Sequence, residues 1–218
     1  MADAEAAKYV DGVGFHWYST MYGAVNTYPR LSETHSKHPN LFLLGTEACE
    51  GFIPVLDQGP KAGLWDRAAH YASDILKDLE NHAVGWTDWN LILDVQGGPN
   101  WAKNVVDAPL LLPVTSVDAP RGSVGSFVKN TQYYAMAHFS KYLPPGSSRI
   151  QQIIKKPLLS RILSTAFVTP NGRIVVIVVN NGDDSIVSIG VGGSSSNLSI
   201  LVAADSINTI VLPSSLGL

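Results

Sequence analysis

A glutamate closes a short apolar run in the first quarter of the chain. The run 42–46 is strand-like, Glu47 follows it, and small residues then turn the chain. A second short apolar run ends in aromatic and polar groups, at Gly85-Trp86-Thr87-Asp88-Trp89-Asn90. Two successive strands that carry such groups at their C-terminal ends are typical of an α/β-barrel active site.

These residue types suit sugar chemistry. A carboxylate can act at an anomeric carbon, an indole offers a flat apolar face to a sugar ring, and an amide can bond hydroxyl groups. The alternative interpretation is that Glu47 is an ordinary strand-end carboxylate in a salt bridge, and the spacing alone leaves both open.

Composition excludes several other classes. Of the 218 residues, 45% are hydrophobic and 15% are charged, which is typical of a globular chain with a substantial core. The net charge of −3 provides no basic footprint for nucleic acid. Six histidines show no metal-ligand spacing, so neither a metal nor a cofactor is expected. The single cysteine, Cys49, allows no internal disulfide, and we expect a buried structural thiol rather than a nucleophile.

The sequence shows no targeting signal in its first residues and no membrane-spanning segment. Residues 1–8 are acidic and helix-prone and lack the apolar core of a signal peptide, and no apolar run is long enough to span a bilayer. As written, the chain is not expected to enter the secretory pathway by itself.

Helical and strand-like patterns alternate in the first half. The periodicity predicts three helix–strand pairs, and strands alternating with helices favour a parallel sheet. The predicted helices cover 2–9, 28–38 and 64–81, and the predicted strands cover 12–18, 42–47 and 84–90.

The second half reads differently. Residues 107–123 are predicted to form an extended crossover and 130–142 a helix, and Thr169-Pro170-Asn171-Gly172 is a good hairpin turn. The remainder predicts strands of an antiparallel β-sandwich at 150–155, 161–168, 173–180, 185–191, 198–203 and 207–212.

The predicted fold is therefore α/β plus all-β. Three parallel strands cannot close an eight-stranded barrel, so we expect the C-terminal part of a (β/α)8 TIM barrel, about three βα units, followed by sandwich strands. The expected divisions are 1–105 for the barrel part, 106–149 for the crossover and last helix, and 150–218 for the sandwich.

The order of several motifs resembles the acid β-glucosidases (glucosylceramidases) of glycoside hydrolase family thirty. The resemblance covers essentially the whole chain, and its most specific blocks are residues 84–91 and 97–101. The other matching motifs are residues 6–10, His16-Trp17-Tyr18, Glu33-Thr34-His35, Thr46-Glu47-Ala48-Cys49, Leu64-Trp65-Asp66-Arg67, His138-Phe139-Ser140-Lys141 and Pro170-Asn171-Gly172.

This resemblance implies roles for five residues. Glu47 matches the catalytic nucleophile at the end of the seventh barrel strand. His16 and Tyr18 match positions at the end of the sixth strand that bond the carboxylates and line the pocket. Trp89 and Asn104 match positions that contact glucose. Val105 stands where an aromatic residue is expected, and the loops at 19–30 and 50–60 also depart from the pattern.

The implied activity is retaining hydrolysis of the β-glucosidic bond of glucosylceramide to glucose and ceramide, in sphingolipid catabolism in the lysosome. A saposin-like activator and an anionic membrane surface are the implied partners. The implied acid/base is the Glu of an Asn-Glu pair, which does not occur in these 218 residues. Asp88 is more consistent with a structural ion pair than with a surrogate acid.

The 218-residue chain alone is therefore expected to be inactive. Two alternatives remain open: a non-catalytic truncated or paralogous chain, and a β-rich region 150–212 that acts alone as a binding module.

Overall fold

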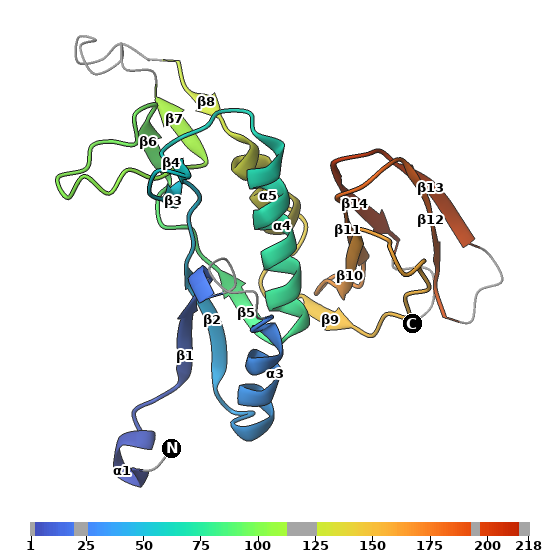
Figure 1. The fold of residues 1–218 in the computed structure, drawn as a ribbon. Helices are drawn as coiled ribbons and strands as arrows, with labels where there is room; N and C mark the ends of the chain where they lie inside the picture. Colours follow the sequence, from blue (N-terminus) through green and yellow to red (C-terminus); the bar gives the residue numbers. More distant parts are fainter. Residues whose placement is uncertain (1–2, 20–25, 113–125, 193–196, 214–218) are drawn as a thin grey trace. The chain divides into compact units, whose positions relative to one another are not determined.

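A computed structural model describes residues 3–19, 26–112, 126–192 and 197–213. The chain forms two compact units, and helix α4 (Trp65–Glu80) contributes to both. The first unit combines Met1–Leu64 with Lys77–Gln132, and the second combines Trp65–Leu76 with Tyr133–Leu218. Figure 1 follows the elements along the chain.

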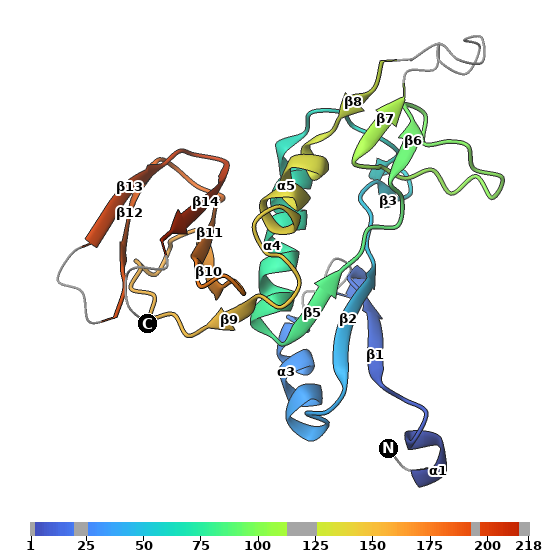
Figure 2. The same ribbon diagram turned by 180° about the vertical axis from the view of Figure 1, so that it is seen from behind.

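The first unit contains a three-stranded parallel sheet in the order β1-β2-β5. The segment at 42–47 lies between the other two strands, as short βαβ crossovers place sequential strands side by side, and Figures 1 and 2 show the three strands together. The strands are β1 (Gly12–His16), β2 (Phe42–Glu47) and β5 (Ala83–Trp86).

Two of these strands end earlier than predicted. The strand expected at 12–18 stops at His16, and the strand expected at 84–90 stops at Trp86. A change of register after Phe15 ends the regular pairing of β1. Of the proposed site residues, His16 is therefore the last residue of β1, whereas Tyr18 and Trp89 lie beyond the ends of their strands.

The predicted helices are confirmed within one or two residues. Helix α1 (Ala4–Ala7) is short, and Asp3 caps it by accepting the N–H groups of Glu5 and Ala6. Helix α3 (Tyr28–Lys37) lies beside β2 in both views. The apolar stripe of α4 is buried as its period predicts, at Ala68, Tyr71, Ala72, Ile75 and Leu76.

Two small sheets complete the first unit. The hairpin of β3 (Phe52–Ile53) and β4 (Asp57–Gln58) follows β2 directly. The other sheet joins β6 (Ile92–Asp94), β7 (Leu110–Leu112) and β8 (Val128–Lys129). The prediction of an extended crossover at 107–123 is wrong over residues 110–112, because these form strand β7, which pairs in parallel with β6. The rest of that crossover, from 113, lies outside the described residues.

The second unit contains helix α5 (Thr131–Ser140) and two antiparallel sheets. One has the order β14-β11-β10-β9 and the other is the β12–β13 pair. The strands are β9 (Ser148–Ile150), β10 (Ile162–Val168), β11 (Ile174–Asn180), β12 (Ser185–Gly190), β13 (Asn197–Val202) and β14 (Ser206–Leu212). The predicted turn is confirmed, since the N–H of Gly172 donates 2.8 Å to the carbonyl of Thr169.

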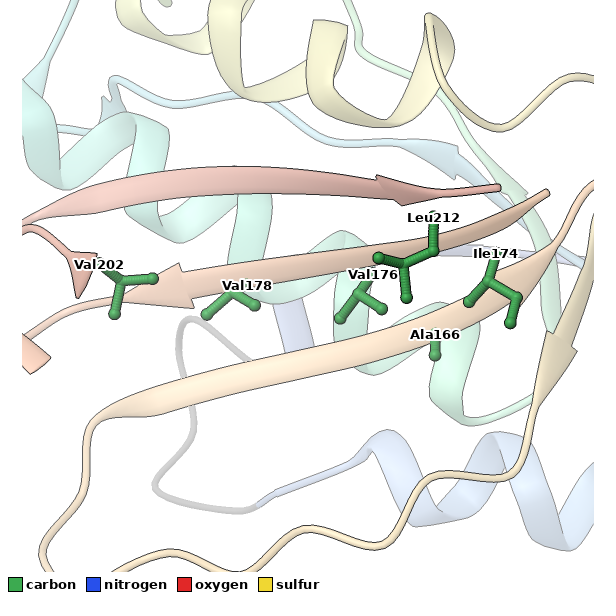
Figure 3. Close-up of a cluster of buried hydrophobic side chains, with 6 residues drawn as sticks. All are labelled: Ala166, Ile174, Val176, Val178, Val202 and Leu212. Atoms are coloured by element: carbon green, nitrogen blue, oxygen red, sulfur yellow. The ribbon is translucent and has the colours of Figure 1, made fainter. Parts of the chain in front are cut away.

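Both sheets share one apolar core, as a sandwich requires. All seven residues of β11 are buried, and alternate ones point into the cluster drawn in Figure 3. From the β12–β13 pair, Val202 is buried in this cluster, and Val187 and Ile189 pack against it.

The strand predicted at 150–155 is wrong beyond Ile150. Residues 151–157 form no regular structure. Gln152 donates to the Ser164 hydroxyl over 2.6 Å, and Lys156 Nζ donates to the Ile162 carbonyl over 2.9 Å. Pro157 adds a position with no N–H.

Candidate active site

Glu47 reaches its position through an irregularity in β2. Phe15 pairs with Gly45, but the next residue of β1, His16, pairs with Glu47, so Thr46 is an extra residue. The Thr46 hydroxyl donates 3.2 Å to the Phe15 carbonyl, which holds the bulge. Because side chains alternate between the faces of a strand, this one-residue insertion brings the Glu47 side chain level with that of His16.

Two side chains from the end of β1 meet the Glu47 carboxylate. The Tyr18 hydroxyl donates a 2.9 Å hydrogen bond to Oε1, and His16 Nδ1 lies 3.7 Å from the same oxygen. Among the described residues, Oε2 has no hydrogen-bond partner. The side chain of Glu47 is 22% exposed and that of His16 is 49% exposed. The structure therefore brings these three residues together and leaves Oε2 without a bond to any described residue.

The side chain of Tyr18 is held in place by Phe52 and Cys49. It stands in a short helical turn after β1, and its ring packs edge-on against Phe52 at 4.8 Å between centroids. Its oxygen lies 3.3 Å from Sγ of Cys49. Burial raises the pKa of Tyr18 well above its ordinary value, and the negative charge of Glu47 acts in the same direction. The hydroxyl therefore stays protonated and serves as a donor.

Cys49 is the buried thiol that the sequence predicts. It is 3% exposed, in a cluster with Leu93, Val106, Ala108 and Leu111. Burial raises the pKa of Cys49 to about 12, and the negative charges of Asp88, Glu47 and Glu50 act in the same direction. A thiol that stays protonated is a poor nucleophile.

Trp89 is placed beside the same strand end by its backbone. Its N–H donates 2.8 Å to the carbonyl of Ala48, the residue after Glu47. The residue is 55% exposed. A half-exposed indole offers a flat surface on which a sugar ring can stack.

Asn104 is not joined to this group by any contact among the described residues. It lies at the end of a turn organised by Asn100, whose Oδ1 accepts the N–H groups of Ala102 and Asn104 and whose Nδ2 donates to the Asn104 carbonyl. The Asn104 side chain is exposed.

Sequence reasoning missed the aromatic support beneath the site. The buried Trp17 packs against Trp86 and Phe52, with ring centroids 6.4 and 6.3 Å apart. The signal was present, because Trp17 follows β1 and Trp86 ends β5, the two strands on either side of β2.

The loop after Glu47 is fixed by backbone geometry. Gly51 has a φ of 73°, and its carbonyl accepts the N–H of Gly59 over 2.9 Å. The carbonyl of Glu50 accepts the N–H of Asp107 over 2.9 Å. The Asp107 carboxylate is fully buried and accepts the side-chain amide of Asn130 over 2.9 Å. These bonds tie the β3–β4 hairpin to the segment leading into β7.

The described residues hold no group of three or more histidine, cysteine, aspartate or glutamate side chains that could bind a metal ion. Within the same ranges, every helix is too short or too polar to cross a membrane.

Comparison with known families decides the relationship. Residues 1–143 match the glycosyl hydrolase family 30 TIM-barrel domain, and residues 146–210 match the β-sandwich domain of the same family. The chain belongs to glycosyl hydrolase family 30. Strands β1, β2 and β5 are thus part of a TIM barrel, and the second unit carries the family's sandwich, which confirms the predicted fold class.

Curated relatives carry the name glucosylceramidase. The chain is 40% identical over 211 residues to putative glucosylceramidase 3 of Caenorhabditis elegans, covering 96% of this chain and 37% of that protein. It is 37% identical over 186 residues to mouse (Mus musculus) lysosomal acid glucosylceramidase, covering 85% and 34%. The chain therefore spans about a third of the length of these relatives.

A solved structure shows the same fold. SrfJ from Salmonella typhimurium superposes with a TM-score of 0.79 at 22% identity, over 96% of this chain and 42% of that one. This likeness concerns the fold alone.

Proposed function

We propose that this family 30 chain provides the nucleophile of a retaining β-glucosidase that hydrolyses glucosylceramide to glucose and ceramide. The observation that carries the proposal is the placement of Glu47: it ends a barrel strand, Tyr18 holds one carboxylate oxygen, and the other oxygen is left for reaction. The glucosylceramidase names of the relatives support the substrate.

The proposed reaction has two steps. In the first, Oε2 of Glu47 attacks C1 of the glucosyl group and the bond from C1 to the ceramide oxygen breaks. That oxygen keeps the electron pair and takes a proton from a second carboxylic acid about 5 Å from the nucleophile. In the second step, water attacks C1, gives its proton to the second carboxylate, and releases Glu47 and glucose with retention. No residue of this chain is assigned as the second carboxylate.

The other site residues serve binding in this proposal. Trp89 stacks on the sugar ring, and Asn104 bonds a hydroxyl group once the substrate is in place. His16 lies near enough to Glu47 to orient the carboxylate together with Tyr18. Such contacts accelerate the reaction only as far as they are stronger in the transition state than with bound substrate.

The cellular role, the partners and the division of the chain are also proposed from the resemblance to this family. We propose a role in sphingolipid catabolism in the lysosome, supported by the name of the mouse relative. An anionic membrane surface and a saposin-like activator would then be the partners. We keep the division at 1–105, 106–149 and 150–218 as the proposed functional layout.

Labelling with a 2-fluoro-glucoside that carries an activated leaving group tests the proposal. Such a leaving group departs without protonation, so labelling depends on the nucleophile rather than on the acid. In a form of the protein that contains the acid/base carboxylate, mass spectrometry of a digest should find the label on Glu47. The Glu47→Gln variant should take up no label and lose several orders of magnitude in kcat.

Two results would contradict the proposal. A label on Asp88 or Glu50 would reject Glu47 as the nucleophile. A protein that binds glucosylceramide, takes up no label and turns over no substrate would favour the alternative of a non-catalytic, glucosylceramidase-like chain.

A further inference from the structure

We infer that Cys49 is a positioning residue for the proposed nucleophile: its S–H donates to the Tyr18 oxygen and thereby commits the Tyr18 proton to Oε1 of Glu47. The inference rests on the proposed function only for its catalytic consequence. The hydrogen-bond chain itself is a property of three described side chains.

The first step is a count of protons. Among the described residues, the Tyr18 oxygen has two polar neighbours, Oε1 of Glu47 at 2.9 Å and Sγ of Cys49 at 3.3 Å, but a phenol carries one proton. A carboxylate is a much stronger acceptor than a thiol sulfur. The Tyr18 proton therefore goes to Glu47, and the Tyr18–Cys49 contact is a hydrogen bond only if the thiol donates.

The second step concerns the state of the thiol. Burial keeps the pKa of Cys49 at about 12, so the sulfur carries its proton across the physiological range. A protonated thiol is a weak donor, and the Tyr18 oxygen still has lone pairs to accept it. Donation from Cys49 polarises the phenol, and hydrogen bonds in such a chain strengthen one another.

The third step is geometric. Cys49 follows Glu47 by two residues, and Tyr18 reaches both from the end of β1. The ring of Tyr18 is also packed against Phe52, so its hydroxyl has little freedom to move away. With Oε1 held, the carboxylate has one defined orientation, and Oε2 is the oxygen that faces the reaction.

Infrared spectroscopy tests the hydrogen-bond chain without any activity. Cys49 is the one cysteine of these 218 residues, so the 218-residue chain has a single S–H stretching band. We expect this band at the lower frequency of a hydrogen-bonded thiol, and we expect it to move to the free-thiol position in Tyr18→Phe. A wild-type band already at the free-thiol position, or one that Tyr18→Phe leaves in place, would overturn the inference.

A second variant covers the case in which Tyr18→Phe does not fold. In Glu47→Leu the Tyr18 proton loses its anionic acceptor and can turn toward the sulfur, so the S–H band should also change. No change in that variant would count against the inference as well.

Kinetics in a catalytically complete form test the consequence. We expect Cys49→Ala to lower kcat about threefold to tenfold with KM unchanged, and Cys49→Ser, which keeps a donor, to recover most of the loss. In a Tyr18→Phe background the effect of Cys49→Ala should vanish, because Cys49 acts through Tyr18. An equal loss in Cys49→Ser, or a loss that persists in that background, would show a packing role instead. A failure of Glu47 as nucleophile would remove the kinetic effects and leave the infrared result intact.

Discussion

The hydroxyl of Tyr18 lies 2.9 Å from Oε1 of Glu47, although 29 positions separate the two residues in the sequence. The contact exists because β1 and β2 are neighbouring parallel strands whose C-terminal ends meet at one edge of the sheet. It makes the placement of the proposed nucleophile depend on tertiary structure as well as on the local sequence around Glu47.

Removing this hydroxyl should therefore impair catalysis without unfolding the protein. In a form that turns over substrate, Tyr18→Phe should lower kcat about tenfold to a hundredfold, the range for losing a hydrogen bond to a charged group. Tyr9→Phe is a matched control, because Tyr9 is 86% exposed. Steady-state rates on a fluorogenic β-glucoside would measure both, and equal rates in the two variants would contradict the assigned contact.

The glycines that flank the β3–β4 hairpin provide a matched pair for stability. Gly51 and Gly59 have φ values of 73° and 76°, so alanine costs about 1–2 kcal/mol of backbone strain at either position. At Gly51 the new Cβ would also press against the Gly59 carbonyl, whereas at Gly59 it would meet open space. Urea unfolding should therefore show Gly51→Ala to be less stable than Gly59→Ala by at least about 1 kcal/mol. Equal unfolding midpoints and slopes for the two variants would disprove the close approach of the Gly51 backbone to the Gly59 carbonyl.

His138 should make the second unit sensitive to acid. Burial lowers the pKa of His138 below its ordinary 6.5, and Nδ1 lies 2.8 Å from the Thr209 hydroxyl. Because folding favours the neutral ring, its contribution to stability is complete above pH 6.5 and is lost as the pH falls toward the lowered value. The free energy of unfolding should fall less steeply between pH 7.5 and 5 in His138→Gln than in wild type. Parallel pH profiles would mean that His138 titrates normally.

The 218-residue chain by itself should not turn over substrate at enzymatic rates. Loss of general acid assistance alone costs about 10²–10⁴-fold, and Glu47→Gln in the same chain gives the background rate. A fluorogenic β-glucoside at pH 5 would be a suitable assay. Turnover near enzymatic rates that Glu47→Gln abolishes would mean that another residue of this chain provides the acid.

Strand order and the meeting of the site residues were within reach of the sequence. The apolar run that ends at Glu47 and the helical periods on either side of it predict a parallel sheet, and parallel strands bring their C-terminal ends together. The family resemblance added Tyr18 and His16, which the structure places on the carboxylate. It also proposed Asn104, which no contact among the described residues joins to Glu47.

Other features depend on contacts that no local pattern encodes. Strands β6 and β7 have three residues each, too few for a period to emerge, and they pair across a long loop. The apolar residues after Ile150 suggest a strand, but the backbone from 151 to 157 joins no ladder, and Gln152 and Lys156 contact β10 through their side chains. Cys49 was expected to be buried, yet its approach to Tyr18 is visible only once β1 lies beside β2.

The extra residue in β2 gives the strand a tolerance in length at the site. Deleting Thr46 would restore regular pairing with β1, in which the residue after Gly45 lies opposite His16, and that residue would then be Glu47. A homologous sequence with a gap at this position would therefore keep its proposed nucleophile opposite the same histidine, and it would lose only the hydrogen bond from the Thr46 hydroxyl to the Phe15 carbonyl.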